Sequence, residues 1–527
     1  MTTAINILIL MPILLPFLLA LVIFGLRKWI TSFSGELGSG IVVINIAIIS
    51  ALIVRIMDSY HKILYGIYDN SQGLEYGAPT GIQFRIDGST SWLMLSLNIL
   101  MFFILAYESS KRREQLSSPI YISLLLFLLA GVNCILISYD FFTLFLSWVI
   151  ICLTLILMLT FSRKGEDLKE SGVRSYITFG LSMGFLLFAV VLCYGIFGTL
   201  NFDYVSNHKE LFTLEIQQSF TLLIYLIIAL VVISFGLIAQ LFLLNLWMPN
   251  TTEKVSTSTK IVISGFTSSL ALISLFRVLY GFFNPRNYQG VNYSLILAII
   301  GIITAFEGII LIIHQFTRKE SEGISLTKII IFSAITNIGI IMTTLSFGGI
   351  IINENSETVF IENCIGYSYL QIINIGITLF LLFITSEKFS QWRNKSDNLY
   401  DLRGIGKTLR ITALVFIIGL FSNAGLIPTL GGITIFMLIT SLIQAGYFVF
   451  GILIAIINIA LFVCYLYIIK IILFDKPESG IILGNLGDDI SFSTVIGLVL
   501  SITLIILGIL PSILANGLIN GVSAIVP

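Results

Sequence analysis

The chain has 527 residues, of which 57% are hydrophobic and 11% are charged, and its formal net charge is zero. A soluble globular protein carries about 25% charged residues, so this chain has too few charges to cover a surface that faces water. The composition excludes a disordered chain, a nucleic-acid-binding protein and an ordinary cytosolic enzyme, and it predicts a membrane protein with many spans.

Apolar runs long enough to cross a bilayer follow one another along the chain. A hydrocarbon core of about 30 Å requires about 20 residues of helix. No Lys or Arg precedes the first run, which favours a retained span over a cleaved signal or an Arg-rich transit peptide. The criterion predicts fourteen transmembrane helices, at 5–26, 38–57, 91–107, 118–138, 141–162, 175–197, 219–246, 261–283, 293–315, 327–350, 364–386, 411–445 with an interruption, 446–473 and 490–514.

The connections between these spans differ in length and charge. The longest, 58–92, contains the turn signal Asp87-Gly88, which predicts a short hairpin at the membrane surface. Of the 28 Lys and Arg residues, 22 fall on the connections that follow odd-numbered spans. Because positive loops stay on the cytoplasmic or matrix side, we expect the odd connections there. Both termini are then expected on the intermembrane-space or periplasmic side.

Two predicted helices contain helix-breaking residues. The seventh span ends in the segment 245–250, with the sequence NLWMPN, and the twelfth is interrupted at 423–432, with the sequence NAGLIPTLGG. Interrupted helices at matching places in two halves are typical of ion carriers built from repeats, because non-helical backbone inside a membrane persists only where it is buried or lines a cavity. Alternatively, Pro and Gly simply kink these two helices for packing.

Cysteine and histidine are too scattered for metal chemistry. The five cysteines form no C-x-x-C pair, and the three histidines lie far apart in the sequence. That spacing fits neither a zinc site nor an iron–sulfur cluster. Glycine-rich nucleotide-binding motifs are also missing from the sequence. We therefore expect no metal and no cofactor in this chain.

Five short motifs follow one another in order along most of the chain. They are YGIFGTLN at 194–201, LWMP at 246–249 with Arg277 closing the next helix, SAITNIG at 333–339, DLRGI at 401–405 and AGLIPTLG at 424–431. Each motif is short, so the signal lies in their shared order. In that order they resemble the ND2 or NuoN type of antiporter-like subunit in the membrane arm of respiratory complex I, the proton-pumping NADH:ubiquinone oxidoreductase.

The resemblance implies an all-α membrane fold of about fourteen helices. Its core would be two inverted five-helix repeats, 118–283 (helices 4–8) and 293–475 (helices 9–13), with helices 7 and 12 broken. Helices 1–3 and the hairpin would occupy 1–117, and helix 14 would lie in 489–527.

The resemblance also implies a function in the respiratory chain. The chain would be NADH dehydrogenase subunit 2 or its bacterial equivalent, in the mitochondrial or the bacterial inner membrane. Its partners would be the lipid bilayer and other membrane-arm subunits. Electron transport and NADH binding would belong to those other subunits, so this chain alone would hold no redox site and no catalytic residue.

The residues that carry protons in the family are replaced here by neutral ones. A buried lysine can store and release a proton because burial lowers its pKa while a nearby glutamate raises it again. None of the replacements titrates near neutral pH, so we expect a degenerate proton channel. The alternatives are a stand-alone Mrp-type cation/proton antiporter, which would need a titratable core, and a purely structural spacer. The neutral positions are Val149, Ile238, Asn245, Ser269, Asn337 and Ile435.

A few ionisable residues remain inside or near the predicted spans. Glu307, His314 and Arg318 share one helix face, at spacings of seven and four residues. They form a substitute half-channel, or else Glu307 is hydrogen-bonded to a neighbour while His314 approaches the interface. Three lysines lie near the positively charged side, where long side chains reach the headgroups by snorkelling. These weaker proton-route candidates are Lys260, Lys328 and Lys470.

Overall fold

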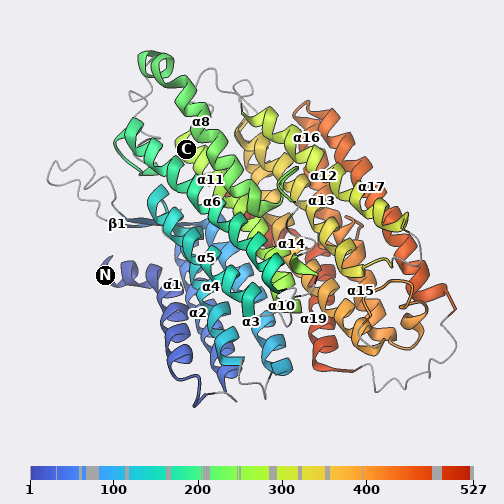
Figure 1. The fold of residues 1–527 in the computed structure, drawn as a ribbon. Helices are drawn as coiled ribbons and strands as arrows, with labels where there is room; N and C mark the ends of the chain where they lie inside the picture. Colours follow the sequence, from blue (N-terminus) through green and yellow to red (C-terminus); the bar gives the residue numbers. More distant parts are fainter. Residues whose placement is uncertain are drawn as a thin grey trace.

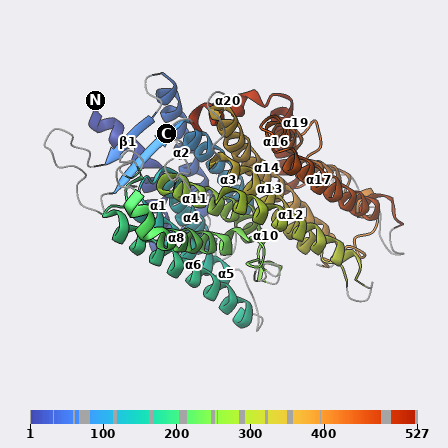
Figure 2. The same cartoon turned by 90° about the horizontal axis from the view of Figure 1, so that it is seen from above.

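The computed structural model describes residues 2–30, 33–58, 62–66, 82–112, 118–161, 168–202, 205, 214–245, 247, 251–253, 255–283, 293–318, 323–349, 357–393, 396–476 and 490–522. The described helices lie side by side in a broad slab, with α1 and α2 at one end and α16 and α17 at the other (Figure 1; Figure 2). Thirteen helices in the described ranges are long and apolar enough to cross a membrane. The prediction of an all-α membrane protein is therefore confirmed.

The helices agree with the predicted spans to within a few residues at most ends. Two spans contain π-helical turns, at Val262–Thr267 between α10 and α11 and at Lys470–Phe474 after α17. The helices are α1 Thr2–Gly25, α2 Ser34–Asp58, α3 Gly88–Arg112, α4 Ser118–Ile137, α5 Phe141–Phe161, α6 Leu168–Phe197, α8 Leu214–Ala239, α10 Thr257–Ile261, α11 Ser268–Phe282, α12 Ser294–Phe316, α13 Leu326–Ser346, α14 Glu357–Trp392, α15 Arg410–Asn423, α16 Leu430–Gln444, α17 Phe448–Ile469, α19 Phe492–Ile509 and α20 Ser512–Val522.

The predicted twelfth span is divided into two shorter apolar helices, α15 and α16, which complete the fourteen. A short non-helical segment joins them, and Gly425 there adopts a left-handed φ of +75°. The first turn of α16 lies against the end of α15, since a Cβ at Gly431 would stand 1.8 Å from the Ser422 carbonyl oxygen. Glycine is required at that contact, and the predicted interruption is confirmed.

The break in the seventh span begins at Gln240, earlier than the expected Asn245. Helix α8 ends at Ala239, and both Gln240 and Leu243 have left-handed φ, at 65° and 68°. These residues carry side chains, so no glycine or proline in the sequence marks the position. The Trp247 indole N–H donates to the Leu237 carbonyl at 2.9 Å, which satisfies one of the carbonyls left at the end of α8.

A two-stranded antiparallel sheet, β1 (Lys62–Gly66) and β2 (Gln83–Asp87), occupies the long connection. The antiparallel pair confirms the predicted short hairpin, but Asp87-Gly88 is not its turn, because Asp87 ends β2 and Gly88 begins α3. The Asp87 carboxylate accepts hydrogen bonds from the Thr90 backbone N–H and the Ser89 hydroxyl, both at 2.9 Å. An acidic side chain at a helix start satisfies N–H groups that have no partner within the helix.

Three asparagines hold α1 to α2, α3 and α4. Pro16 has no N–H, so the carbonyl of Pro12, four residues earlier, loses its helical hydrogen bond. Asn45 and Asn133 donate to that oxygen at 3.1 and 2.8 Å. Asn98 joins the two, accepting from Asn45 at 3.1 Å and donating to Asn133 at 2.8 Å. Side chains from neighbouring helices thus satisfy the group that proline frees.

Helices α12 and α13 pack closely against each other. A Cβ at Gly339 would lie 2.4 Å from the Ala305 nitrogen, and one at Gly308 would lie 2.3 Å from the Thr336 hydroxyl. Small residues permit such close approach in membranes. This contact fixes which face of α12 points away from the bundle. The division into repeats at 118–283 and 293–475 stays a prediction.

Candidate functional site

The six positions where the family resemblance expects channel residues lie within or beside the polar interior. Five of the six are buried, and Val149 is half-buried. The Ser269 hydroxyl donates to the Gly265 carbonyl of its own helix at 2.8 Å. Ile238 lies just before the first break, and the Ile435 side chain lies against Gly425 in the second. The positions are therefore inside the fold, but their side chains carry no titratable group.

Asn337 and Asn423 form the centre of a polar network beside the second break. Asn337, on α13, donates its side-chain N–H to the Asn423 side-chain oxygen at 2.9 Å. Asn423, at the end of α15, donates to the Ser333 hydroxyl at 3.0 Å and to the Tyr465 hydroxyl at 2.7 Å. All four residues are buried. Three helices thus meet through uncharged hydrogen bonds.

The same network continues onto α14 and α16. Gln371 donates to the Asn337 side-chain oxygen at 3.1 Å and accepts a hydrogen bond from Thr434. Ser422 donates to Asn374 at 2.7 Å, and its hydroxyl accepts from the Gly431 backbone N–H at 3.3 Å. Polar side chains therefore satisfy part of the backbone that the break frees. We call this the amide network; it consists of Ser333, Asn337, Gln371, Asn374, Ser422, Asn423, Thr434 and Tyr465.

A smaller polar group surrounds the first break. Gln240 donates to the Ser268 hydroxyl at 2.5 Å, and the Phe242 backbone N–H donates to the Thr304 hydroxyl at 3.0 Å. The Ser268 hydroxyl donates in turn to the Ile263 carbonyl at 2.8 Å, five residues back, where the π-helical turn displaces the usual pairing. The break in α8 is thus held by side chains of α11 and α12.

Glu307 lies beside this break, near the middle of the span Ser294–Phe316. Its carboxylate accepts a hydrogen bond from the Asn245 amide at 2.7 Å, and its side chain is half-buried. His314, on the same helix face, is exposed. No ion pair among the described residues joins Glu307 to a lysine or arginine. The half-channel interpretation of Glu307 and His314 stays a prediction.

The lysine candidates lie apart from Glu307, near one end of the helices. Lys328 forms an ion pair with Glu253 at 3.0 Å, and Lys470 is exposed in the π-helical turn after α17. Lys260 points inward, where its ammonium group donates to the Thr327 hydroxyl at 3.3 Å. The Thr327 hydroxyl donates to Asp397 at 3.0 Å. No contact found among the described residues connects these lysines to the amide network.

Other carboxylates at this end escaped the sequence analysis. Glu387, on α14, accepts hydrogen bonds from Tyr107 and Lys111 of α3. Glu108, also on α3, accepts one from Ser258 of α10. Within the described ranges, no three His, Cys, Asp or Glu side chains are grouped as a metal site requires. These carboxylates join α3 to α10 and α14 where the helices end.

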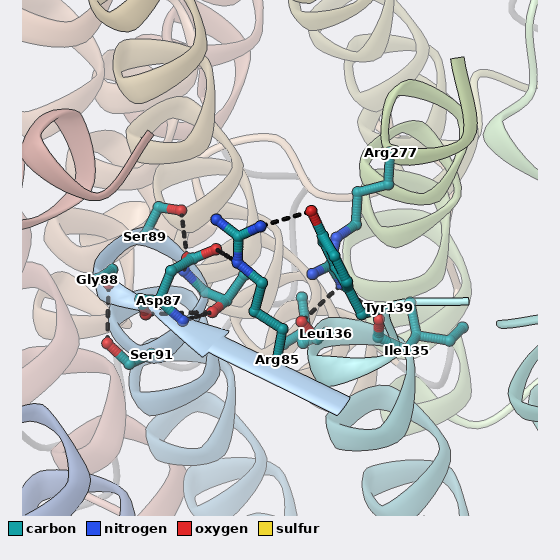
Figure 3. A network of polar contacts seen from close by, with 10 residues as sticks. Arg85, Asp87, Gly88, Ser89, Ser91, Ile135, Leu136, Tyr139 and Arg277 are labelled. Carbon is teal, nitrogen blue, oxygen red and sulfur yellow. Dashed lines mark hydrogen bonds and ion pairs between the residues drawn. The ribbon is translucent and has the colours of Figure 1, made fainter. Parts of the chain in front are cut away.

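Two arginines at the opposite end are buried in a second charged network (Figure 3). Arg277 donates to the carbonyls of Ile135 and Leu136, at 2.7 and 2.6 Å, and so satisfies the last turn of α4. The Arg85 guanidinium lies over the Tyr139 ring, 4.6 Å from its centroid, and within 3.9 Å of Asp87. Both arginines belong to the six Lys and Arg residues outside the odd connections, so their burial leaves fewer exposed cations on that side of the membrane.

Asp140 anchors the turn between α4 and α5 beside this network. Its carboxylate accepts from the Gln83 backbone N–H at 2.9 Å and from the Thr143 backbone N–H at 2.6 Å. Burial raises the pKa of Asp140, although these hydrogen bonds act in the opposite direction. The carboxyl group thus joins β2 to the start of α5.

Sequence reasoning missed most of the amide network. Gln371 and Asn374 lie three residues apart on a mainly apolar helix, and that spacing is the signal that would have marked them. Thr434 and Tyr465 carry no comparable pattern, because their partners are distant in the sequence. The structure alone brings these residues together.

Known proteins match the chain in sequence and in fold. Residues 138–461 match the family profile described as NADH:quinone oxidoreductase/Mrp antiporter, TM. The NADH-quinone oxidoreductase subunit N of Thioalkalivibrio sulfidiphilus is 24% identical over 82% of this chain and 84% of its own length. The subunit N of Polaromonas naphthalenivorans is 23% identical over 84% and 85%.

Three solved structures share the fold. A chain of the archaeal membrane-bound sulfane sulfur reductase has a TM-score of 0.82 at 19% identity, covering 99% of this chain and 98% of that one. A chain of the Mrp complex from Dietzia sp. DQ12-45-1b has 0.80 at 16% identity, with the same two coverages. A chain of respiratory complex I from Thermus thermophilus has 0.66 at 14%, covering 96% and 100%. Because the profile match spans more than half of the sequence, this chain belongs to the family of transmembrane subunits shared by NADH:quinone oxidoreductases and Mrp antiporters.

Proposed function

We propose that this chain is a membrane-arm subunit of an NADH:quinone oxidoreductase and supports electron transport coupled to proton translocation. Curated relatives named subunit N of that enzyme align over four-fifths of both chains, which favours this member of the family. Those relatives come from bacteria, so a bacterial inner membrane is favoured over the mitochondrial one. Other membrane-arm subunits would be its partners and would hold NADH and the redox cofactors.

We further propose that the chain has lost the lysine-based proton path of its family. The observation that carries this proposal is the amide network, in which Asn337 is hydrogen-bonded to both Asn423 and Gln371. Amide side chains neither bind nor release a proton near neutral pH. A charge at the middle of a membrane costs about 2.5 to 3.5 kcal/mol, so a subunit that does not pump gains stability by losing it.

The test counts protons per NADH in the assembled enzyme, reconstituted into liposomes. The Asn337→Leu substitution breaks the centre of the amide network, and Val149→Leu is a matched apolar control. We expect the same proton stoichiometry for both variants and the unmodified enzyme, at equal rates of NADH oxidation. A lower stoichiometry for Asn337→Leu with unchanged NADH oxidation would show that the network conducts protons.

A stand-alone cation/proton antiporter is the second candidate. The TM-score of 0.80 with an Mrp complex chain favours it, although a shared fold does not decide between the two activities. Mild solubilisation separates the candidates. A complex subunit extracts together with partner subunits and NADH oxidation activity, whereas an antiporter extracts without that activity and exchanges cations for protons in liposomes.

A further inference from the structure

One outward-facing surface combines a helix break with a carboxylate. It consists of Phe242 and Leu243 in the break after α8, and of Ile303, Glu307 and Ile310 on α12. Leu243 is 68% exposed and Ile310 is 62% exposed, and Phe242 and Ile303 are exposed as well. We call these five residues the Glu307 surface. It lies near the middle of the span Ser294–Phe316, so it faces the hydrocarbon core of the membrane.

The irregular backbone of the break is the first sign that another protein covers this surface. Gln240 and Leu243 have left-handed φ, and the Phe242 N–H is paired with Thr304, at the depth of Glu307. Irregular backbone at membrane depth is tolerated where protein covers it or where it lines a water-filled cavity, but not against lipid. The neighbouring side chains are apolar, which favours a protein surface over water.

The Glu307 carboxylate is the second sign. Asn245 donates one hydrogen bond to it, and no ion pair among the described residues includes it. Intramembrane carboxylates almost always face the protein interior or a cavity and pair with other groups. Glu307 instead is only half-buried, and it lies between the exposed residues Ile303 and Ile310 on α12. Among the described residues no basic side chain pairs with Glu307, so charge complementarity favours a donor from a neighbouring subunit.

The surface is also rigid enough to be recognised. Gly301, Gly308 and Gly339 hold α12 against α13, and isoleucine side chains have few rotamers. We infer that the Glu307 surface docks a transmembrane helix of a neighbouring subunit, which places a basic side chain against Glu307. This inference rests on the proposed function, since it requires an assembly of several membrane subunits.

The first test places a photoreactive cross-linking residue in the intact, purified complex. Ile310→p-benzoylphenylalanine lies on the Glu307 surface, and Ile459→p-benzoylphenylalanine is a control on the exposed face of α17. We expect the Ile310 probe to join a transmembrane peptide of another subunit that contains Lys or Arg. Cross-linking of Ile310 to lipid, or to a second copy of this chain, would overturn the inference.

The second test reads the state of the carboxyl group. Dicyclohexylcarbodiimide modifies protonated carboxyl groups in apolar surroundings, and mass spectrometry locates the adduct. A basic partner keeps Glu307 ionised and covered, so we expect labelling about tenfold slower in the complex than in subunits separated by harsh detergent. Equal labelling in both samples would mean that Glu307 faces lipid in its protonated form.

A charge reversal supplies the third test. Glu307→Lys should lower the assembled fraction about tenfold, because it opposes two positive charges, whereas Ile459→Lys should not. Assembly should return when the basic residue found by cross-linking is changed to Glu. If NADH oxidation co-purifies while Glu307 faces lipid, this inference alone fails. If no such activity co-purifies, the proposed function fails, and the Ile310 cross-link still decides the docking surface.

Discussion

The asparagines around Pro12 allow a sharp test of how this membrane bundle is held together. Asn133→Leu removes two hydrogen bonds, one to the Pro12 carbonyl at 2.8 Å and one with Asn98 at 2.8 Å. Hydrogen bonds between membrane helices average about 0.6 kcal/mol and reach about 1.7, so the loss should be about 1 to 3 kcal/mol. Unfolding by SDS in mixed micelles measures it.

Repeating Asn133→Leu in a Pro16→Ala background tests whether the cost comes from the hydrogen bond to the Pro12 carbonyl. Alanine restores the N–H that the Pro12 carbonyl lacks, so Asn133 is no longer needed there. We expect the cost of Asn133→Leu to fall by about 0.6 kcal/mol or more in that background. Ser50→Ala is the control, because the Ser50 hydroxyl donates to Ile46 of its own helix. Equal costs with and without Pro16 would refute the role of Asn133.

Three further predictions concern single residues. Gly431→Ala places a Cβ 1.8 Å from a carbonyl oxygen and should lower the free energy of unfolding by more than about 3 kcal/mol. Gly446→Ala meets open space and should lower it by about 1 to 3 kcal/mol, because Gly446 has a left-handed φ. Folded yield and unfolding in mixed micelles measure both. Arg277→Met should destabilise by about 2 to 6 kcal/mol, because it leaves the buried carbonyls of Ile135 and Leu136 without this donor; a cost below about 1 would contradict this. Because folding raises the pKa of Asp140, its contribution to the free energy of unfolding is present at low pH and is lost as the pH rises through the raised pKa. Asp140→Asn should remove this decrease from a plot of unfolding free energy against pH.

The spans and the second break were predictable because their signals are local. Bilayer thickness converts apolar length into helix number, and thirteen long helices plus α15 and α16 match the fourteen predicted spans. Pro428 and the glycines around it predict the second break, since proline lacks a backbone N–H donor and glycine permits a left-handed backbone.

Other features required the tertiary structure. The first break begins at Gln240 and Leu243, whose left-handed backbone carries no glycine signal and is held by contacts with α11 and α12. Asp87 looked like a turn residue, but it caps α3. Local patterns report which conformations are accessible, whereas the choice among them depends on neighbours that are distant in the sequence.

The polar interior shows the same limit most clearly. The sequence alone determined that neutral residues stand where the resemblance expects channel residues, because residue type can be read at each position without the fold. Only the folded chain decided that Asn337 meets Asn423, 86 residues away, and that Arg85 meets Tyr139, 54 residues away. In a membrane each buried polar group needs a hydrogen-bond partner, and the sequence shows which spans contain such groups. The identity of the partner follows from which helices pack together, and that is set by the whole bundle.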